Sequence, residues 1–187
     1  MPRPIRKLLH CLLSALLGLA AFASMGDART ADDIVPAQPS DVVTIVWGII
    51  SYTRWPGEQE SLRICLPKDN AYAAAIRESA KIVNLGRPIV VRNMPPEAAS
   101  ACDVVYFSVM SNDETGRLLK TFTNAPVLTI GEGSAFCTMG GMFCLLSGGG
   151  SAKGSGAKFA ANLDATSRSP LRINPRILRL SKHGRGR

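Results

Sequence analysis

The chain has 187 residues, 46% of them hydrophobic, with 22 Lys or Arg against 14 Asp or Glu and a formal net charge of +8. The excess charge lies at the two ends, because residues 24–167 carry 12 basic and 14 acidic side chains whereas residues 168–187 carry seven basic ones and no acid. A nearly neutral middle argues against a nucleic-acid-binding surface spread over the domain.

The N-terminus has the parts of a secretory signal peptide. Arg3, Arg6 and Lys7 precede an uncharged run whose apolar centre spans residues 11–23, and small residues allow cleavage after Ala23 or as late as position 28. A retained membrane anchor is the alternative, but a spanning helix needs about 20 apolar residues, more than the dense part provides. We therefore expect residues 1–23 to be removed on export. A flexible lead-in at 24–39, one domain at 40–182 and a basic tail at 183–187 follow.

Removal of the signal peptide would leave four cysteines: Cys65, Cys102, Cys137 and Cys144. An even number in an oxidising compartment favours two disulfides, and three pairings are possible. No Cys-x-x-Cys motif is present to create a redox-active thiol. His183 is the only histidine left to complete a zinc site, so we expect no metal.

Short apolar segments alternate with helical patterns in the first half of the chain. Ser40 or Asp41 is expected to cap a helix that reaches Trp47, although residues 42–46 are also β-prone and leave a strand possible. Beyond this point the sequence predicts a strand at 62–66, a helix at 71–83 capped by Asn70, a strand at 88–92 and a helical turn at 95–101.

The alternation continues in the second half, with a strand at 103–108, a helix at 112–122 and a strand at 126–130. Residues 135–146 are apolar and interrupted by two glycines, which suggests a hairpin, and a Gly/Ser-rich loop at 148–156 precedes a strand at 158–162. A final helix is expected to begin at Asn174-Pro175, with Ile177, Leu178 and Leu180 facing inward. This pattern predicts an α/β fold, a single layered domain with a mixed β-sheet flanked by helices and stabilised by disulfides.

Motifs for catalysis or cofactor binding are missing from the sequence. With His183 in the tail, a Ser-His-Asp or Cys-His arrangement has no base in the folded part. Gly131-Glu132-Gly133 resembles the start of a dinucleotide-binding motif, but its sixth position is Phe136 and nothing marks a helix there. The glycine-rich stretch at 149–156 also lacks the ending of a phosphate loop. From its residues alone, the chain is predicted to be an exported binding module without a cofactor.

Four stretches resemble the YfiR family of periplasmic regulators in their order and spacing. They are residues 48–56 (Gly-Ile-Ile-Ser-Tyr-Thr-Arg-Trp-Pro), residues 133–144 with their two cysteines, residues 162–169 (Asn-Leu-Asp-Ala-Thr-Ser-Arg-Ser) and residues 173–180 (Ile-Asn-Pro-Arg-Ile-Leu-Arg-Leu). The resemblance covers about residues 40–182. The Gly/Ser-rich stretch at 148–156 departs from the family, in which this connection is usually less glycine-rich.

The resemblance implies a periplasmic repressor of an inner-membrane diguanylate cyclase of the YfiN type. Such a protein binds the periplasmic sensor domain of the cyclase, lowers cyclic-di-GMP and restrains biofilm formation. An outer-membrane lipoprotein of the YfiB type sequesters it under envelope stress, and the family is commonly dimeric. The resemblance also implies disulfides Cys65–Cys102 and Cys137–Cys144.

Five residues are candidates for binding a protein partner: Arg54, Trp55, Pro56, Arg168 and Arg176. Trp and Arg dominate interface hot spots, and arginines can steer an acidic partner. Burial of Trp55 against Pro56 is the alternative for that pair. A periplasmic small-molecule binding protein is the main alternative function, and a thiol oxidoreductase is disfavoured by the absence of Cys-x-x-Cys.

Overall fold

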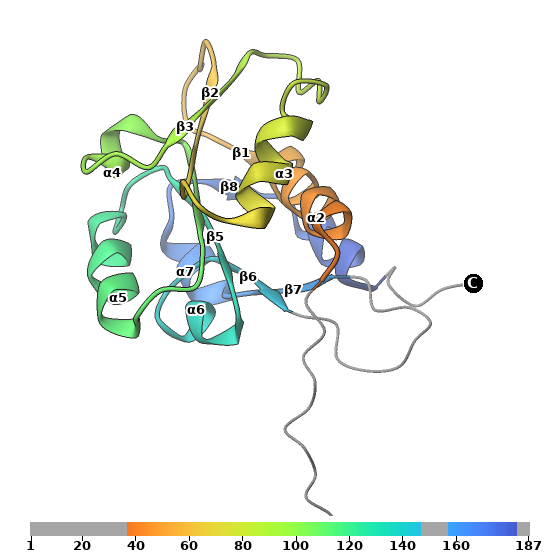
Figure 1. The fold of residues 1–187 in the computed structure, drawn as a ribbon. Coiled ribbons are helices and arrows are strands. Elements are labelled where there is room, and N and C mark those ends of the chain that lie inside the picture. The colour runs from red at the N-terminus through yellow and green to blue at the C-terminus, as the bar shows by residue number, and fades with distance from the viewer. Residues whose placement is uncertain (1–36, 147–156, 183–187) are drawn as a thin grey trace, which may run out of the picture. The chain divides into compact units, whose positions relative to one another are not determined.

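The computed structural model describes residues 37–146 and 157–182. The predicted signal peptide, nearly all of the lead-in, the Gly/Ser-rich loop and the basic tail lie outside these residues. The described residues form a six-stranded sheet between two groups of helices (Figure 1). This arrangement confirms the predicted α/β class and the mixed sheet flanked by helices.

The sheet contains β2 (Leu62–Leu66), β3 (Ile89–Asn93), β4 (Val104–Phe107), β5 (Leu128–Glu132), β6 (Phe143–Leu146) and β7 (Lys158–Ala161). Their order is β3-β2-β4-β5-β6-β7. The first five pair in parallel, and β7 pairs antiparallel with β6. Parallel pairing requires a crossover between successive strands, which explains why helical segments separate them in the sequence.

Side chains alternate between the two faces of the sheet. On β4, Val104 and Tyr106 pack on one face, and Val105 and Phe107 pack on the other, all of them at most 1% exposed. Because helices cover both faces, both sets of side chains are buried. This double burial explains why the central strands read as continuous apolar runs rather than as alternating ones.

One face is covered by α2 (Pro39–Ser51), α3 (Ala71–Ser79) and the 3-10 helix η1 (Pro175–Lys182). Helix α2 begins with Pro39 in its first turn, and its N-cap residue, Gln38, makes no side-chain cap. The expected cap at Ser40 or Asp41 is therefore wrong, and so is the strand alternative for residues 42–46. Asn70 does cap α3, by accepting a hydrogen bond from the Ala73 N–H at 2.9 Å.

The other face is covered by α4 (Ala98–Ala101), α5 (Asn112–Thr121) and α6 (Ser134–Thr138). Phe107 from the sheet packs against Phe122 and Phe136, with ring centroids 6.0 and 4.9 Å apart. Both disulfides also lie here, in the pairing that the family resemblance implies. Cys65–Cys102 ties β2 to the start of β4, and Cys137–Cys144 ties α6 to β6.

Residues 135–146 do not form the expected hairpin. They form α6, a turn and β6, which lies parallel to β5. A helix thus begins at Ser134, where the sequence did not indicate one. The Phe136 ring fills the space above two glycines, because a Cβ on Gly131 or Gly141 would come within 2.5 or 2.1 Å of that ring. Gly131 and Gly141 therefore accommodate an aromatic ring rather than a ligand.

Two helices end or turn differently from the expectation. Helix α3 ends at Ser79 rather than at residue 83, because the next residues form turns that bond back to Glu78 and Ser79. In η1, Ile177 is buried as expected, but Leu178 and Leu180 are 41% and 37% exposed. Three residues per turn place Ile177 and Leu180 on one side of a 3-10 helix, so the inward orientation expected of Leu178 is wrong.

Besides α6, three short elements were not predicted: β1 (Thr53–Arg54), β8 (Arg172–Ile173) and α7 (Leu163–Arg168). Strands β1 and β8 pair antiparallel in a small sheet of their own. Helix α7 is capped by Asn162, whose side chain accepts a hydrogen bond from the Ala165 N–H at 3.0 Å. The small sheet places two distant parts of the sequence side by side.

The two disulfides should differ in their contribution to stability. Cys65 and Cys102 are 37 positions apart and Cys137 and Cys144 are 7 apart, so chain-entropy estimates give about 4 and about 2.5 kcal/mol. We expect the variant Cys65→Ala/Cys102→Ala to lose more free energy of unfolding than Cys137→Ala/Cys144→Ala. Urea unfolding of both variants measures the difference. A larger loss from the shorter loop would contradict it.

Candidate functional site

The Arg-Trp-Pro corner after α2 is divided between core and surface. Trp55 is 8% exposed, and its indole N–H donates to the backbone carbonyl of Asp103 at 3.1 Å. The Arg87 guanidinium lies over the Trp55 ring, 5.0 Å from its centroid. Arg54 and Pro56 on either side are exposed. Of the predicted partner-binding residues at this corner, Trp55 therefore packs inward and its neighbours remain accessible.

Arg54 lies directly opposite Arg172 in the small β1–β8 sheet. Like charges at such a position repel each other. Neither arginine forms an ion pair with a carboxylate among residues 37–146 and 157–182. One guanidinium nitrogen of Arg54 donates to the carbonyls of Ser51 and Thr53, at 2.8 and 3.1 Å. The Arg54 guanidinium is thus held in place by backbone carbonyls, next to a strand that carries a second arginine.

These two arginines border an open cavity of about 550 Å³, here named the Arg54 cavity. The cavity is lined by Ser51, Tyr52, Arg54, Arg172, Ile173, Asn174 and Pro175. The exposed Arg176 follows the last of these in sequence. The cavity and its rim therefore offer positive charge to an acidic group.

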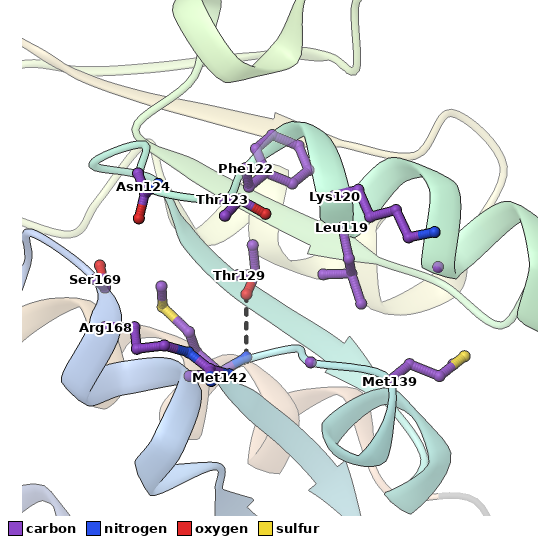
Figure 2. Close-up of a pocket in the computed structure, with 13 residues that line it drawn as sticks. Leu119, Lys120, Phe122, Thr123, Asn124, Thr129, Met139, Met142, Arg168 and Ser169 are labelled. Carbon is purple, nitrogen blue, oxygen red and sulfur yellow. Dashed lines mark hydrogen bonds between the residues drawn. The ribbon is translucent and has the colours of Figure 1, made fainter.

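Arg168 belongs to a different part of the surface. It lies in the last turn of α7, forms an exposed ion pair with Asp164, and lines a second cavity of about 350 Å³. This second cavity, the Thr129 cavity, lies between α5, β5, the α6–β6 turn and α7 (Figure 2). The structure thus brings Arg54 together with Arg172 and does not place Arg168 in the same cavity.

Asp103 forms the most heavily bonded polar contact near the Trp55 corner. Its carboxylate, 4% exposed, accepts hydrogen bonds from the Arg63 backbone N–H at 2.7 Å and from the Arg63 guanidinium at 3.0 and 2.7 Å. The side-chain hydrogen bond to Asp103 raises the pKa of Arg63. The pair fixes β2 against the start of β4, and the backbone carbonyl of the same Asp103 holds the Trp55 indole at the corner.

A second polar group lies where the central parallel strands end. Glu132 accepts hydrogen bonds on one carboxylate oxygen from the Asn70 side chain at 2.9 Å and from the Tyr106 hydroxyl at 3.0 Å. Burial raises the pKa of Glu132, and these hydrogen bonds oppose the shift. Burial, together with the nearby Glu132 charge, raises the pKa of Tyr106 far above its ordinary value. Tyr106 therefore stays a hydrogen-bond donor at physiological pH.

The described part of the chain does not bring three His, Cys, Asp or Glu side chains together as a metal site would require. None of the helices described between residues 37 and 182 has the length and apolar character to cross a membrane. The surface features that stand out are cavities bordered by basic side chains. The fold and these sites define a disulfide-linked α/β domain with surfaces suited to binding.

The sequence identifies the family of this domain. Residues 42–182 match the YfiR/HmsC-like family, and the chain belongs to it. The family is regulatory rather than catalytic. Membership indicates a periplasmic regulator of cyclic-di-GMP signalling that interacts with a regulatory partner.

Sequence reasoning missed three of the residues that form these sites. Arg172 was visible only as one of the basic residues of the C-terminal part, because its pairing with Arg54 depends on the fold. Thr129 lies within a predicted strand, where a single threonine gives no signal. Glu132 was noted only as part of a glycine motif, although a charged residue ending a buried strand could have drawn attention to it.

The Arg63–Asp103 pair predicts a large effect on stability. Arg63→Met would leave a buried carboxylate with a single backbone donor, and breaking a buried pair in this way costs about 3 kcal/mol. The exposed pair Arg168–Asp164 offers a matched control, because Arg168→Met should cost less than about 1 kcal/mol. Urea unfolding of both variants tests this. Equal losses of free energy of unfolding would show that the buried pair stabilises the fold no more than the exposed pair does.

Glu132 predicts a specific pH dependence of folding. Its pKa in the folded state is raised above the ordinary value of 4.5, so the folded chain holds this proton more tightly than the unfolded chain does. The tighter proton binding adds to the free energy of unfolding. This stabilisation is fully present below pH 4.5 and is lost as pH rises through the raised pKa of Glu132. Glutamine does not ionise, so we expect Glu132→Gln to keep its stability as pH rises and to be more stable than wild type at pH 7.

Urea unfolding from pH 4 to 8 measures the effect, with the exposed loop variant Glu58→Gln as the control for removing one negative charge. The difference in free energy of unfolding between Glu132→Gln and wild type should grow with pH. The difference between Glu58→Gln and wild type should not show this pH dependence. A pH-independent difference for Glu132→Gln would contradict the assignment.

Proposed function

We propose that this chain binds the periplasmic sensor domain of an inner-membrane diguanylate cyclase of the YfiN type and holds the cyclase inactive. Cyclic-di-GMP then stays low and biofilm formation is restrained. Sequestration by an outer-membrane lipoprotein of the YfiB type releases the cyclase. The proposal places the exported chain in the periplasm after cleavage of its signal peptide.

The observation that carries this proposal is the pairing of Arg54 with Arg172 on the β1–β8 sheet, where neither has a carboxylate partner among the described residues. Two exposed arginines at directly opposite positions of a strand pair attract a carboxylate. Aspartate or glutamate side chains on the sensor domain would relieve the repulsion between them and form charge-assisted hydrogen bonds. This complementarity favours an acidic protein surface as the partner.

The other predicted partner-binding residues have different parts in this proposal. Arg176 and Pro56 lie exposed near the same corner and would extend the contact. Trp55 acts from the core by fixing the backbone that carries Arg54. Arg168, which lines the Thr129 cavity instead, would at most contribute to long-range steering.

A homodimer is part of the same proposal. Strand β3 lies at the edge of the sheet and pairs only with β2 among the described strands. Val90 on this strand and Ile82 before it are 38% and 85% exposed. An unpaired strand edge with apolar side chains is a surface that a second copy can cover.

Removal of either corner arginine should weaken binding to the purified sensor domain of the co-encoded cyclase. We expect Arg54→Ala and Arg172→Ala each to raise Kd at least tenfold, because hot-spot arginines contribute about 2 kcal/mol or more. Arg117→Ala on α5 is the matched control, since Arg117 is exposed and lines neither the Arg54 nor the Thr129 cavity. Biolayer interferometry gives the Kd values.

Circular dichroism melting of the same proteins checks that the variants remain folded. The attraction should also weaken at high salt, because the charges involved are exposed. Binding by folded Arg54→Ala and Arg172→Ala that equals wild type would exclude this corner. A wild-type chain that binds no sensor domain would favour the alternative, a periplasmic small-molecule binding protein.

A further inference from the structure

We propose that the Thr129 cavity binds a small organic carboxylate with an apolar body. The inference goes beyond the proposed function, because it concerns a different surface and does not require a cyclase. The cavity shares no lining residue with the Arg54 cavity.

The cavity has the size and walls of a small-molecule site. Its volume of about 350 Å³ falls at the lower end of the range of about 300–1,000 Å³ that is typical of ligand pockets. Leu119, Phe122 and Met142 are 8%, 5% and 6% exposed and form an apolar lining together with Met139. Methionine side chains adapt readily to the shape of an apolar group. These walls suit an aromatic or aliphatic body.

A buried hydroxyl among these walls supplies a hydrogen-bond donor. Thr129 is 2% exposed, and its Oγ1 accepts a hydrogen bond from the Met142 N–H at 3.1 Å (Figure 2). Among the residues that the structure describes, nothing accepts the proton of this hydroxyl. A threonine hydroxyl can donate and accept at once, and a buried donor without an acceptor is costly. A ligand oxygen in the cavity would accept this proton.

The charges that border the cavity select an anion. Figure 2 shows Lys120 from α5 and Arg168 from α7 on opposite sides of it. Arg168 is paired with Asp164, whereas Lys120 forms no ion pair within the described ranges. The cavity lining contains no acidic residue. A carboxylate that accepts the Thr129 proton would therefore lie in a cavity whose rim carries the ammonium group of Lys120 and an arginine that is paired with Asp164.

Gly116 keeps one side of the cavity open. It lies in the interior of α5, where glycine destabilises a helix relative to alanine. It also lines the cavity, and a Cβ added to it would meet no atom within 4 Å. Packing therefore does not require glycine at this position. The absence of a side chain there leaves room that a ligand can use.

The test measures binding of two probe carboxylates, 3-phenylpropionate and octanoate, to the purified exported chain by isothermal titration calorimetry. The neutral analogue 3-phenylpropanamide tests the need for the charge. We expect at least one carboxylate to bind at millimolar concentration or below, and its amide to bind at least tenfold more weakly. Lys120→Gln should weaken the carboxylate at least threefold.

Gly116→Leu is the decisive variant, because it fills the cavity and at the same time improves the helix. It should abolish binding while raising the melting temperature, which excludes unfolding as the cause. Gly116→Ala is its matched control and should raise the melting temperature while it retains binding. If Gly116→Leu fails to fold, weaker carboxylate binding by Lys120→Gln still shows that the ligand binds in this cavity.

Failure of both carboxylates to bind would overturn the proposal. Equal binding by the amide, or unchanged binding by both Gly116→Leu and Lys120→Gln, would overturn it as well. None of these measurements uses the cyclase sensor domain. Failure of the ligand proposal can therefore be distinguished from failure of the proposed repressor function.

Discussion

The buried residue Asp103 is the constraint on which the central strands and the outer corner both depend. Its side chain binds the backbone and the guanidinium of Arg63 on β2, and its backbone carbonyl accepts from the Trp55 indole and the Leu128 N–H. The residue before it, Cys102, is covalently linked to the same strand β2. One short segment therefore holds β2, β4, β5 and the corner after α2 in register, and the position of Arg54 follows from it.

The two faces of the sheet reach stability by different means. Helix α2 has 13 residues and buries six apolar side chains, so hydrophobic packing is sufficient to hold that face. On the other face, α4 and α6 have only 4 and 5 residues, and helices this short gain little from their own hydrogen bonds. Both disulfides lie on that face, where they add covalent links at α6 and at the end of α4.

The sequence predicted strand positions best where every residue of a strand is buried or nearly so. Residues 62–66 form the predicted strand without change, because parallel strands buried on both faces read as apolar runs. The other large-sheet strands predicted lie within a residue or two of their expected ends. Helix α6 was missed because its five residues are too few to show a period. Trp55 and Arg54 come from one recognisable motif, yet Arg172 joins them only through β1–β8 pairing, which two-residue strands cannot signal.

The segment from Arg168 to Arg172 connects the two candidate sites. Arg168 and Ser169 line the Thr129 cavity, and Arg172 lines the Arg54 cavity. Between them Leu171 is 6% exposed, and its N–H bonds to the Ser169 hydroxyl at 3.1 Å. The segment is therefore anchored in the core rather than loose. A ligand in the Thr129 cavity would contact one end of an ordered connection whose other end carries Arg172, the residue opposite Arg54 in the small sheet.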